Sequence, residues 1–141
     1  MRKNIYFLLA ITLLAFTYTA SAQSAKKQVE EIKFFEGTLP QFKTLLLDSG
    51  KPGFVYLYIN GQRDCMAMNR MFQEKEIAQY VDSNFLAYKV DVEENPDVAL
   101  LYGVETLPAV ILIDNFRQER DRVYNYRTSK DFRKFLNQVL E

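Results

Sequence analysis

Residues 54–59 constrain the fold more than any other segment, because this run of apolar and aromatic residues offers no polar face. Such a strand is buried on both faces of a sheet, which requires helices on both sides of it. The rest of the chain alternates in the same way, with strand patterns at residues 32–35, 85–92, 109–113 and 119–124 and helical patterns at residues 38–49, 64–72, 74–84, 95–103 and 128–139. The order predicts an α/β fold with a central mixed sheet.

The N-terminus carries the pattern of an export signal. Arg2 and Lys3 precede an apolar run over residues 5–16, which ends near the small residues 20–22. Cleavage after Ala22 would leave a single domain, residues 23–141. The run is shorter than the roughly 18 residues of a spanning helix, so an uncleaved anchor is the weaker alternative. We expect an exported protein, periplasmic or extracellular, without a membrane span once the signal is removed.

Composition excludes several classes of chemistry. The chain has no histidine and one cysteine, which rules out Ser/His/Asp and Cys/His catalysis and a zinc site of cysteine and histidine ligands. It also rules out an internal disulfide, and we expect neither a metal nor a cofactor. Loss of Arg2 and Lys3 would leave 16 basic and 18 acidic residues, a net charge of −2. That balance provides no electrostatic footprint for nucleic acid.

Two motifs carry a resemblance to a known family. Residues 95–104 read Asn-Pro-Asp-Val-Ala-Leu-Leu-Tyr-Gly-Val, and the pair Leu107-Pro108 follows shortly after. Together with Lys51-Pro52 before the central run and the order of the elements, these motifs resemble the thioredoxin family over residues 32–140. The resemblance implies a thioredoxin-like fold in which Pro108 follows a cis peptide bond.

The differences from the family cluster at its active site. Thioredoxins carry a W-C-x-x-C motif after the central strand, where this chain has Gly61, Gln62, Arg63, Asp64 and Cys65. Gln62 thus replaces the attacking cysteine, and Cys65 matches the resolving one. One thiol can begin thiol-disulfide exchange but cannot complete a reductase cycle, so ordinary dithiol turnover is excluded.

Two further positions bear on this site through the resemblance. Tyr56 stands where thioredoxins have the buried aspartate that handles the proton of the resolving thiol, and Lys89 matches the lysine beside that aspartate.

Two interpretations of Cys65 stay open. In the first, Gly61 and the amide of Gln62 leave the thiol accessible, and Arg63 favours its thiolate. In the second, Cys65 is a buried small apolar residue, and the carboxylate of Asp64 opposes the thiolate.

The second candidate feature is the groove beside Pro108, where the family binds extended peptide through the main chain of the preceding residue. Leu107 can still provide this main chain, with Gly61, Gln62 and Arg63 at the rim. The competing interpretation is that Pro108 only serves the fold. The sequence favours a non-catalytic domain that binds an extended peptide or protein partner; the alternative is a protein whose Cys65 forms mixed disulfides. Nothing in the sequence specifies an oligomeric state.

Two weaker patterns favour structural roles. The acidic residues at 91, 93, 94 and 97 suit a solvated helix start. The methionines at 66, 68 and 71 suit core packing with one member facing solvent.

Overall fold

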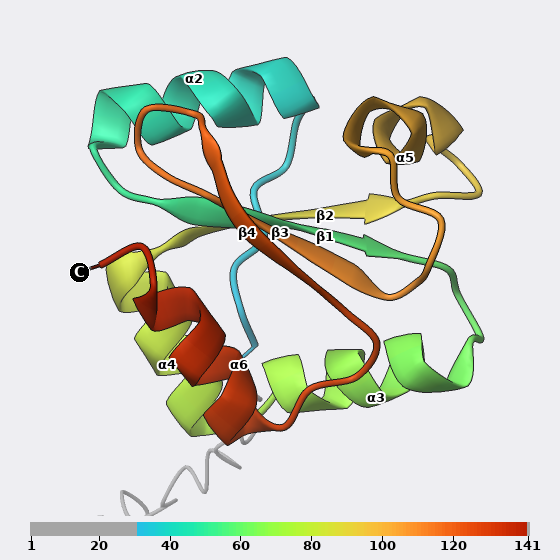
Figure 1. Cartoon of the computed structure of the whole chain (residues 1–141). Helices are drawn as coiled ribbons and strands as arrows, with labels where there is room; N and C mark the ends of the chain where they lie inside the picture. The colour runs from blue at the N-terminus through green and yellow to red at the C-terminus, as the bar shows by residue number, and fades with distance from the viewer. Residues whose placement is uncertain (1–30, 141) are drawn as a thin grey trace, which may run out of the picture.

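Figure 1 shows the computed structural model, which describes residues 31–140. The predicted signal and the boundary at Ala22 lie outside the described residues. The elements in chain order are α2 (Leu39–Ser49), β1 (Gly53–Tyr58), α3 (Arg63–Phe72), α4 (Lys75–Asn84), β2 (Leu86–Asp91), α5 (Pro96–Tyr102), β3 (Ala109–Ile113), β4 (Glu119–Tyr124) and α6 (Ser129–Asn137).

The four strands form one mixed sheet in the order β2-β1-β3-β4. The run that the sequence places at the centre is β1, which pairs in parallel with β2 and antiparallel with β3. The hairpin of β3 and β4 is antiparallel, as the alternating pattern predicts. The expected mixed sheet is therefore confirmed.

Helices cover both faces of this sheet (Figure 1). Phe54 and Tyr56 of β1 face α3, α4 and α6 and belong to one buried cluster. Val55 and Leu57 face the opposite way, toward α2 and α5, and belong to a second cluster. Alternate side chains of β1 thus supply two cores, which explains why the run needs no polar residue.

The strand expected at residues 32–35 is reduced to a single parallel bridge between Phe34 and Ala87. The reason lies in the preceding backbone, which is bonded elsewhere. The N–H of Ile32 donates to the carbonyl of Phe72 at 3.4 Å, and the N–H of Lys33 donates to the Asp82 carboxylate at 3.0 Å. These bonds direct the segment away from the β2 edge before a ladder can form.

The predicted helix starts are confirmed where a threonine precedes the helix. Thr38 caps α2 in a capping box with Gln41, and Thr128 caps α6 by accepting from the N–H of Asp131. Because each cap satisfies an otherwise unpaired N–H group, it fixes the first turn of its helix.

Candidate functional site

The candidate site is built where β1 ends and α3 begins. Gly61 has a φ of +77°, a conformation that glycine adopts without steric cost, and it turns the chain into the helix. Gln62 is the N-cap of α3, and Gly61, Gln62 and Arg63 are all exposed. The three predicted rim residues therefore lie together on the surface, although the structure does not assign them a binding role.

Cys65 lies one turn further along α3 and is fully buried, with 0% of its surface exposed. Its thiol donates a hydrogen bond to Oε1 of Gln62, with the sulfur and oxygen 3.0 Å apart. The Gln62 side chain therefore covers the thiol instead of capping the helix N-terminus. This geometry corresponds to the second interpretation of Cys65, a buried small residue.

The surroundings of Cys65 favour the neutral thiol. Burial raises the pKa of the Cys65 thiol above its ordinary value, and the carboxylates of Asp64 and Asp91 raise it further. The nearby Ile59 backbone and Tyr56 hydroxyl lower this pKa and offset part of the rise. The net change in the pKa of the Cys65 thiol is therefore upward. The first interpretation expects the opposite, because in it Arg63 favours the thiolate.

Tyr56 occupies the centre of β1 directly beneath the start of α3. It is fully buried, and its hydroxyl donates to the backbone carbonyl of Cys65 at 3.2 Å. Its ring packs edge-on against Phe72 at 4.9 Å and parallel to Tyr58 at 5.3 Å. Burial raises the pKa of Tyr56 well above its ordinary value, so the hydroxyl remains a proton donor. Tyr56 therefore holds the helix start in place and provides no proton acceptor for Cys65.

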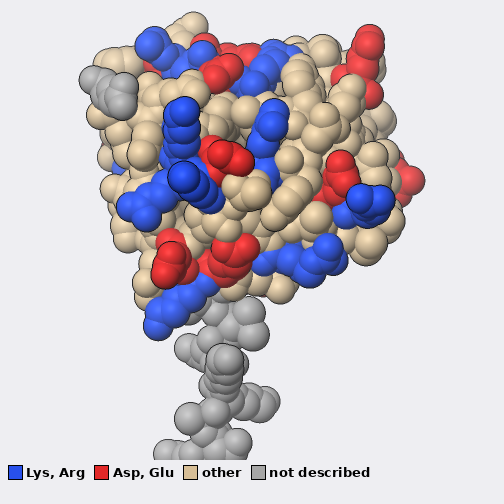
Figure 2. Space-filling view, turned by 60° about the horizontal axis from the view of Figure 1, so that its bottom comes forward, with Lys and Arg blue, Asp and Glu red and all other residues tan. Residues whose placement is uncertain are grey.

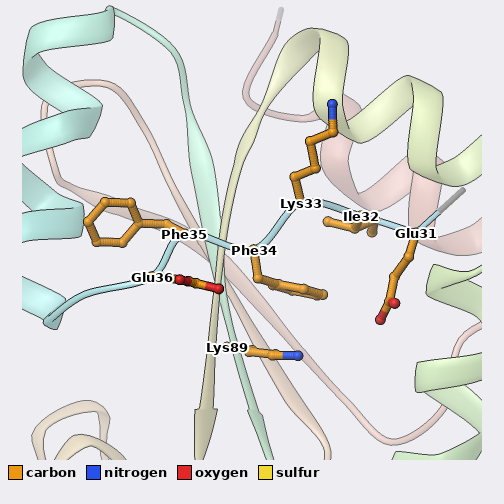
Figure 3. Close-up of a pocket in the computed structure, with 7 residues that line it drawn as sticks. All are labelled: Glu31, Ile32, Lys33, Phe34, Phe35, Glu36 and Lys89. Carbon is orange, nitrogen blue, oxygen red and sulfur yellow. The ribbon is translucent and has the colours of Figure 1, made fainter.

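Lys89 is paired with Tyr56 in the β1–β2 register, as the resemblance implies, but its side chain is directed elsewhere. Its Nζ lies 5.0 Å from the centre of the Phe34 ring. Figure 3 shows Lys89 in a pocket lined mainly by the N-terminal segment 31–36, with a volume of about 360 Å³. Lys89 therefore interacts with the N-terminal segment, while Tyr56 interacts with α3.

Leu107 and Pro108 reach the same edge of the sheet, because Ala109 pairs with Leu57 near the end of β1. The Leu107-Pro108 peptide bond is cis, Pro108 is buried and Leu107 is half-buried. The carbonyl of Pro108 accepts from the N–H of Asn125 at 2.8 Å. Among residues 31–140, neither the N–H nor the carbonyl of Leu107 has a hydrogen-bond partner.

One contact beside the site is absent from the sequence-based prediction. Asp91, expected among solvated acidic residues, is only 8% exposed and accepts from the side chain of Asn60 at 2.6 Å. Its other carboxylate oxygen accepts from the N–H of Glu93 at 3.0 Å. The sequence contained a signal for this contact, because Tyr58 and Asp91 end parallel neighbouring strands and Asn60 follows Tyr58 after one intervening residue.

The surface shows no single-sign patch on the face seen in Figure 2, where Lys and Arg side chains are interspersed with Asp and Glu. Within the described part of the chain, no group of histidine, cysteine and carboxylate side chains is arranged to hold a metal ion. Over the same residues, no helix is both long enough and apolar enough to cross a membrane.

Comparisons with known proteins agree with this architecture. The chain is 30% identical over 81 residues to a thioredoxin of Chlorobaculum thiosulfatiphilum, an alignment that covers 57% of this chain and 73% of the relative. It is 28% identical over 81 residues to thioredoxin 2 of Chlorobaculum tepidum, covering 57% and 72%.

Solved structures show the same fold. A thioredoxin from Thermus thermophilus superposes with a TM-score of 0.67 at 21% identity, covering 78% of this chain and 88% of that one. A mutant thioredoxin from Halobacterium salinarum gives a TM-score of 0.63 at 16% identity, covering 80% and 94%. The Thioredoxin family model matches residues 33–138, and the chain, with its single cysteine, therefore belongs to the thioredoxin family.

Proposed function

We propose that this protein is an exported thioredoxin-like domain that binds extended peptide or protein segments and does not catalyse dithiol chemistry. The observation that carries the proposal is the main chain of Leu107, whose N–H and carbonyl have no hydrogen-bond partner among the described residues. An extended segment that binds like an added strand needs such a donor and acceptor. The neighbouring Pro108 is buried and holds this main chain at the edge of the sheet.

The rim residues support the same function. Gly61 is exposed, and a side chain added there would meet no atom within 4 Å, so the space above it is open. Gln62 and Arg63 are exposed beside it and offer polar groups to a bound segment. A peptide held by Leu107 would therefore find an unobstructed surface on the α3 side.

A degenerate active site supports the absence of dithiol catalysis. Gln62 stands at the position of the attacking cysteine, and its side chain covers the thiol of Cys65. A mixed disulfide at Cys65, the alternative function, would require displacement of Gln62 and ionisation of a thiol whose pKa is raised. The geometry therefore supports binding over the alternative.

Peptide titration followed by amide NMR tests the proposal directly. We expect an unstructured peptide to shift the amide signals of Gly61, Gln62, Arg63 and Leu107 in a saturable manner. A matched peptide that is N-methylated at alternate residues lacks half of the main-chain donors and should bind at least tenfold more weakly. Equal affinity for the two peptides, or shifts confined to other surfaces, would refute main-chain capture at Leu107.

Export requires its own test. The proposal rests on the basic and apolar pattern of residues 2–22. Expression of the full chain in a bacterial host, followed by fractionation and N-terminal sequencing, should yield a protein outside the cytoplasm that begins at Gln23. A cytoplasmic protein that retains Met1 would contradict export without affecting the binding proposal.

A further inference from the structure

Helix α3 carries four sulfur-containing residues that differ sharply in exposure. Cys65 and Met68 are 0% exposed and Met71 is 1% exposed, whereas Met66 is 43% exposed. All four lie within seven consecutive residues of one helix. They therefore share one local segment and differ mainly in how easily an oxidant in solution can reach them. Met66 is therefore the sulfur-containing residue of this helix that is accessible from solution.

Hydrogen bonds reinforce the difference for two of the buried sulfur atoms. The sulfur of Met68 accepts a hydrogen bond from the N–H of Arg127 at 3.4 Å, which engages an electron pair that the sulfur would use to attack a peroxide. The thiol of Cys65 is covered by Gln62 and its pKa is raised, so the thiolate that peroxides oxidise is disfavoured.

We propose that Met66 is a site of reversible oxidation at the rim of the candidate peptide-binding site, and that its oxidation weakens peptide binding. The second half rests on the proposed function. The oxidant is a peroxide: the thioether sulfur attacks one peroxide oxygen, the O–O bond breaks and an S–O bond forms. Sulfur loses two electrons, the peroxide is reduced, and with hydrogen peroxide the second oxygen leaves as water.

The position of Met66 makes this reaction relevant to binding. Met66 lies in the first turn of α3, one helical turn after the rim residue Gln62, to whose carbonyl its N–H donates at 2.9 Å. Its flexible apolar side chain is available to contact side chains of a bound segment. Conversion to the sulfoxide replaces that contact with a polar group. Because Met66 is largely outside the core, the fold should tolerate the change.

Mass spectrometry tests the site of oxidation without any binding assay. The full chain is treated with dilute hydrogen peroxide, quenched at intervals and digested, and fragment ions distinguish the methionines. We expect Met66 to be oxidised at least tenfold faster than Met68 and Met71, and the three rates to converge in denaturant. Oxidation of Met68 or Met71 at the rate of Met66 in the native protein would overturn the proposal.

The consequence for binding is tested by the ratio of affinities before and after peroxide. We expect peroxide to weaken peptide binding by the parent protein at least threefold and methionine sulfoxide reductases to restore the affinity. The Met68→Leu control should show the same peroxide-dependent loss of affinity. Met66→Leu should bind the peptide equally well before and after peroxide. An unchanged affinity after full oxidation of Met66 would overturn the proposal that this oxidation weakens peptide binding. If the peptide does not bind before peroxide is added, the proposed function is overturned instead. The relative oxidation rates of the methionines do not depend on that function.

Discussion

The thiol of Cys65 is fully buried and donates a hydrogen bond to Gln62. Because of this environment, the free energy of unfolding depends on whether the thiol is protonated. The pKa of the thiol is raised in the folded state, so the folded protein retains a proton that the unfolded chain releases above about pH 8.5. The contribution of this thiol to the free energy of unfolding is therefore fully present below that pH. It falls as the pH rises toward the pKa of the thiol in the folded state.

Cys65→Ala should reveal this pH dependence. At pH 7 the variant should lose about 1 to 2 kcal/mol of unfolding free energy, because it removes a fully buried side-chain atom. Above about pH 8.5 the difference from the parent should shrink, by up to about 1.4 kcal/mol per pH unit. Urea denaturation of both proteins at pH 7, 8, 9 and 9.5 measures the difference. A constant difference would mean that the buried thiol ionises normally.

Tyr56→Phe tests the hydroxyl that bonds to the start of α3. The variant keeps the ring stacking but removes the hydroxyl that donates to the carbonyl of Cys65, which keeps its bond within the helix. Loss of one such hydrogen bond costs about 0.5 to 1.5 kcal/mol of unfolding free energy. The matched control is Tyr58→Phe, since Tyr58 is only half-buried and its hydroxyl has no partner among residues 31–140. Equal losses in both variants would show that the Tyr56 bond contributes nothing specific.

At the scale of elements, the contact between Asn60 and Asp91 joins the loop after β1 to the end of β2. Asn60→Ala would leave the buried carboxylate with one partner fewer and release the loop. We expect hydrogen exchange at the amides of residues 61–66 to become at least tenfold faster. The exposed Glu94→Ala serves as the control. Unchanged exchange at these amides would show that the turn at Gly61 holds its shape without Asp91.

Gln62→Cys tests whether the β1–α3 junction still supports the chemistry of the family. The Gln62 side chain already reaches the sulfur of Cys65 at 3.0 Å, so the substituted thiol would face its partner across one helical turn. We expect insulin reduction in the presence of dithiothreitol to exceed that of the parent and of Gln62→Ser. Adding Tyr56→Asp should increase the rate further, because a carboxylate can accept the proton of Cys65. No gain in either variant would show that the junction has lost the required geometry.

At the scale of the whole molecule, periodicity predicted both layers of helices and the mixed sheet, because β1 has apolar residues on both faces and each helix has one apolar stripe. The sequence could not predict that the N-terminal strand shrinks to one bridge, since this depends on where Phe72 and Asp82 lie in space. The cover that Gln62 places over Cys65 and the burial of Asp91 are equally dependent on tertiary contacts. Whether the predicted site residues bind a partner stays a prediction.

Stability must come from packing between these layers, because a single cysteine allows no internal disulfide. Phe132 of α6 illustrates this: it is 0% exposed, and its ring lies 5.5 Å from those of both Phe54 and Phe72. Phe132→Ala should cost about 3 to 5 kcal/mol, a large part of the 5 to 15 kcal/mol typical of a domain. Phe116→Ala, at a residue 68% exposed, should cost less than about 0.5 kcal/mol. Urea denaturation at 10 °C measures both, with Phe132→Leu as the milder variant if Phe132→Ala does not fold. Similar losses at both positions would mean that α6 contributes little to the core and that the sheet and the remaining helices hold the fold without it.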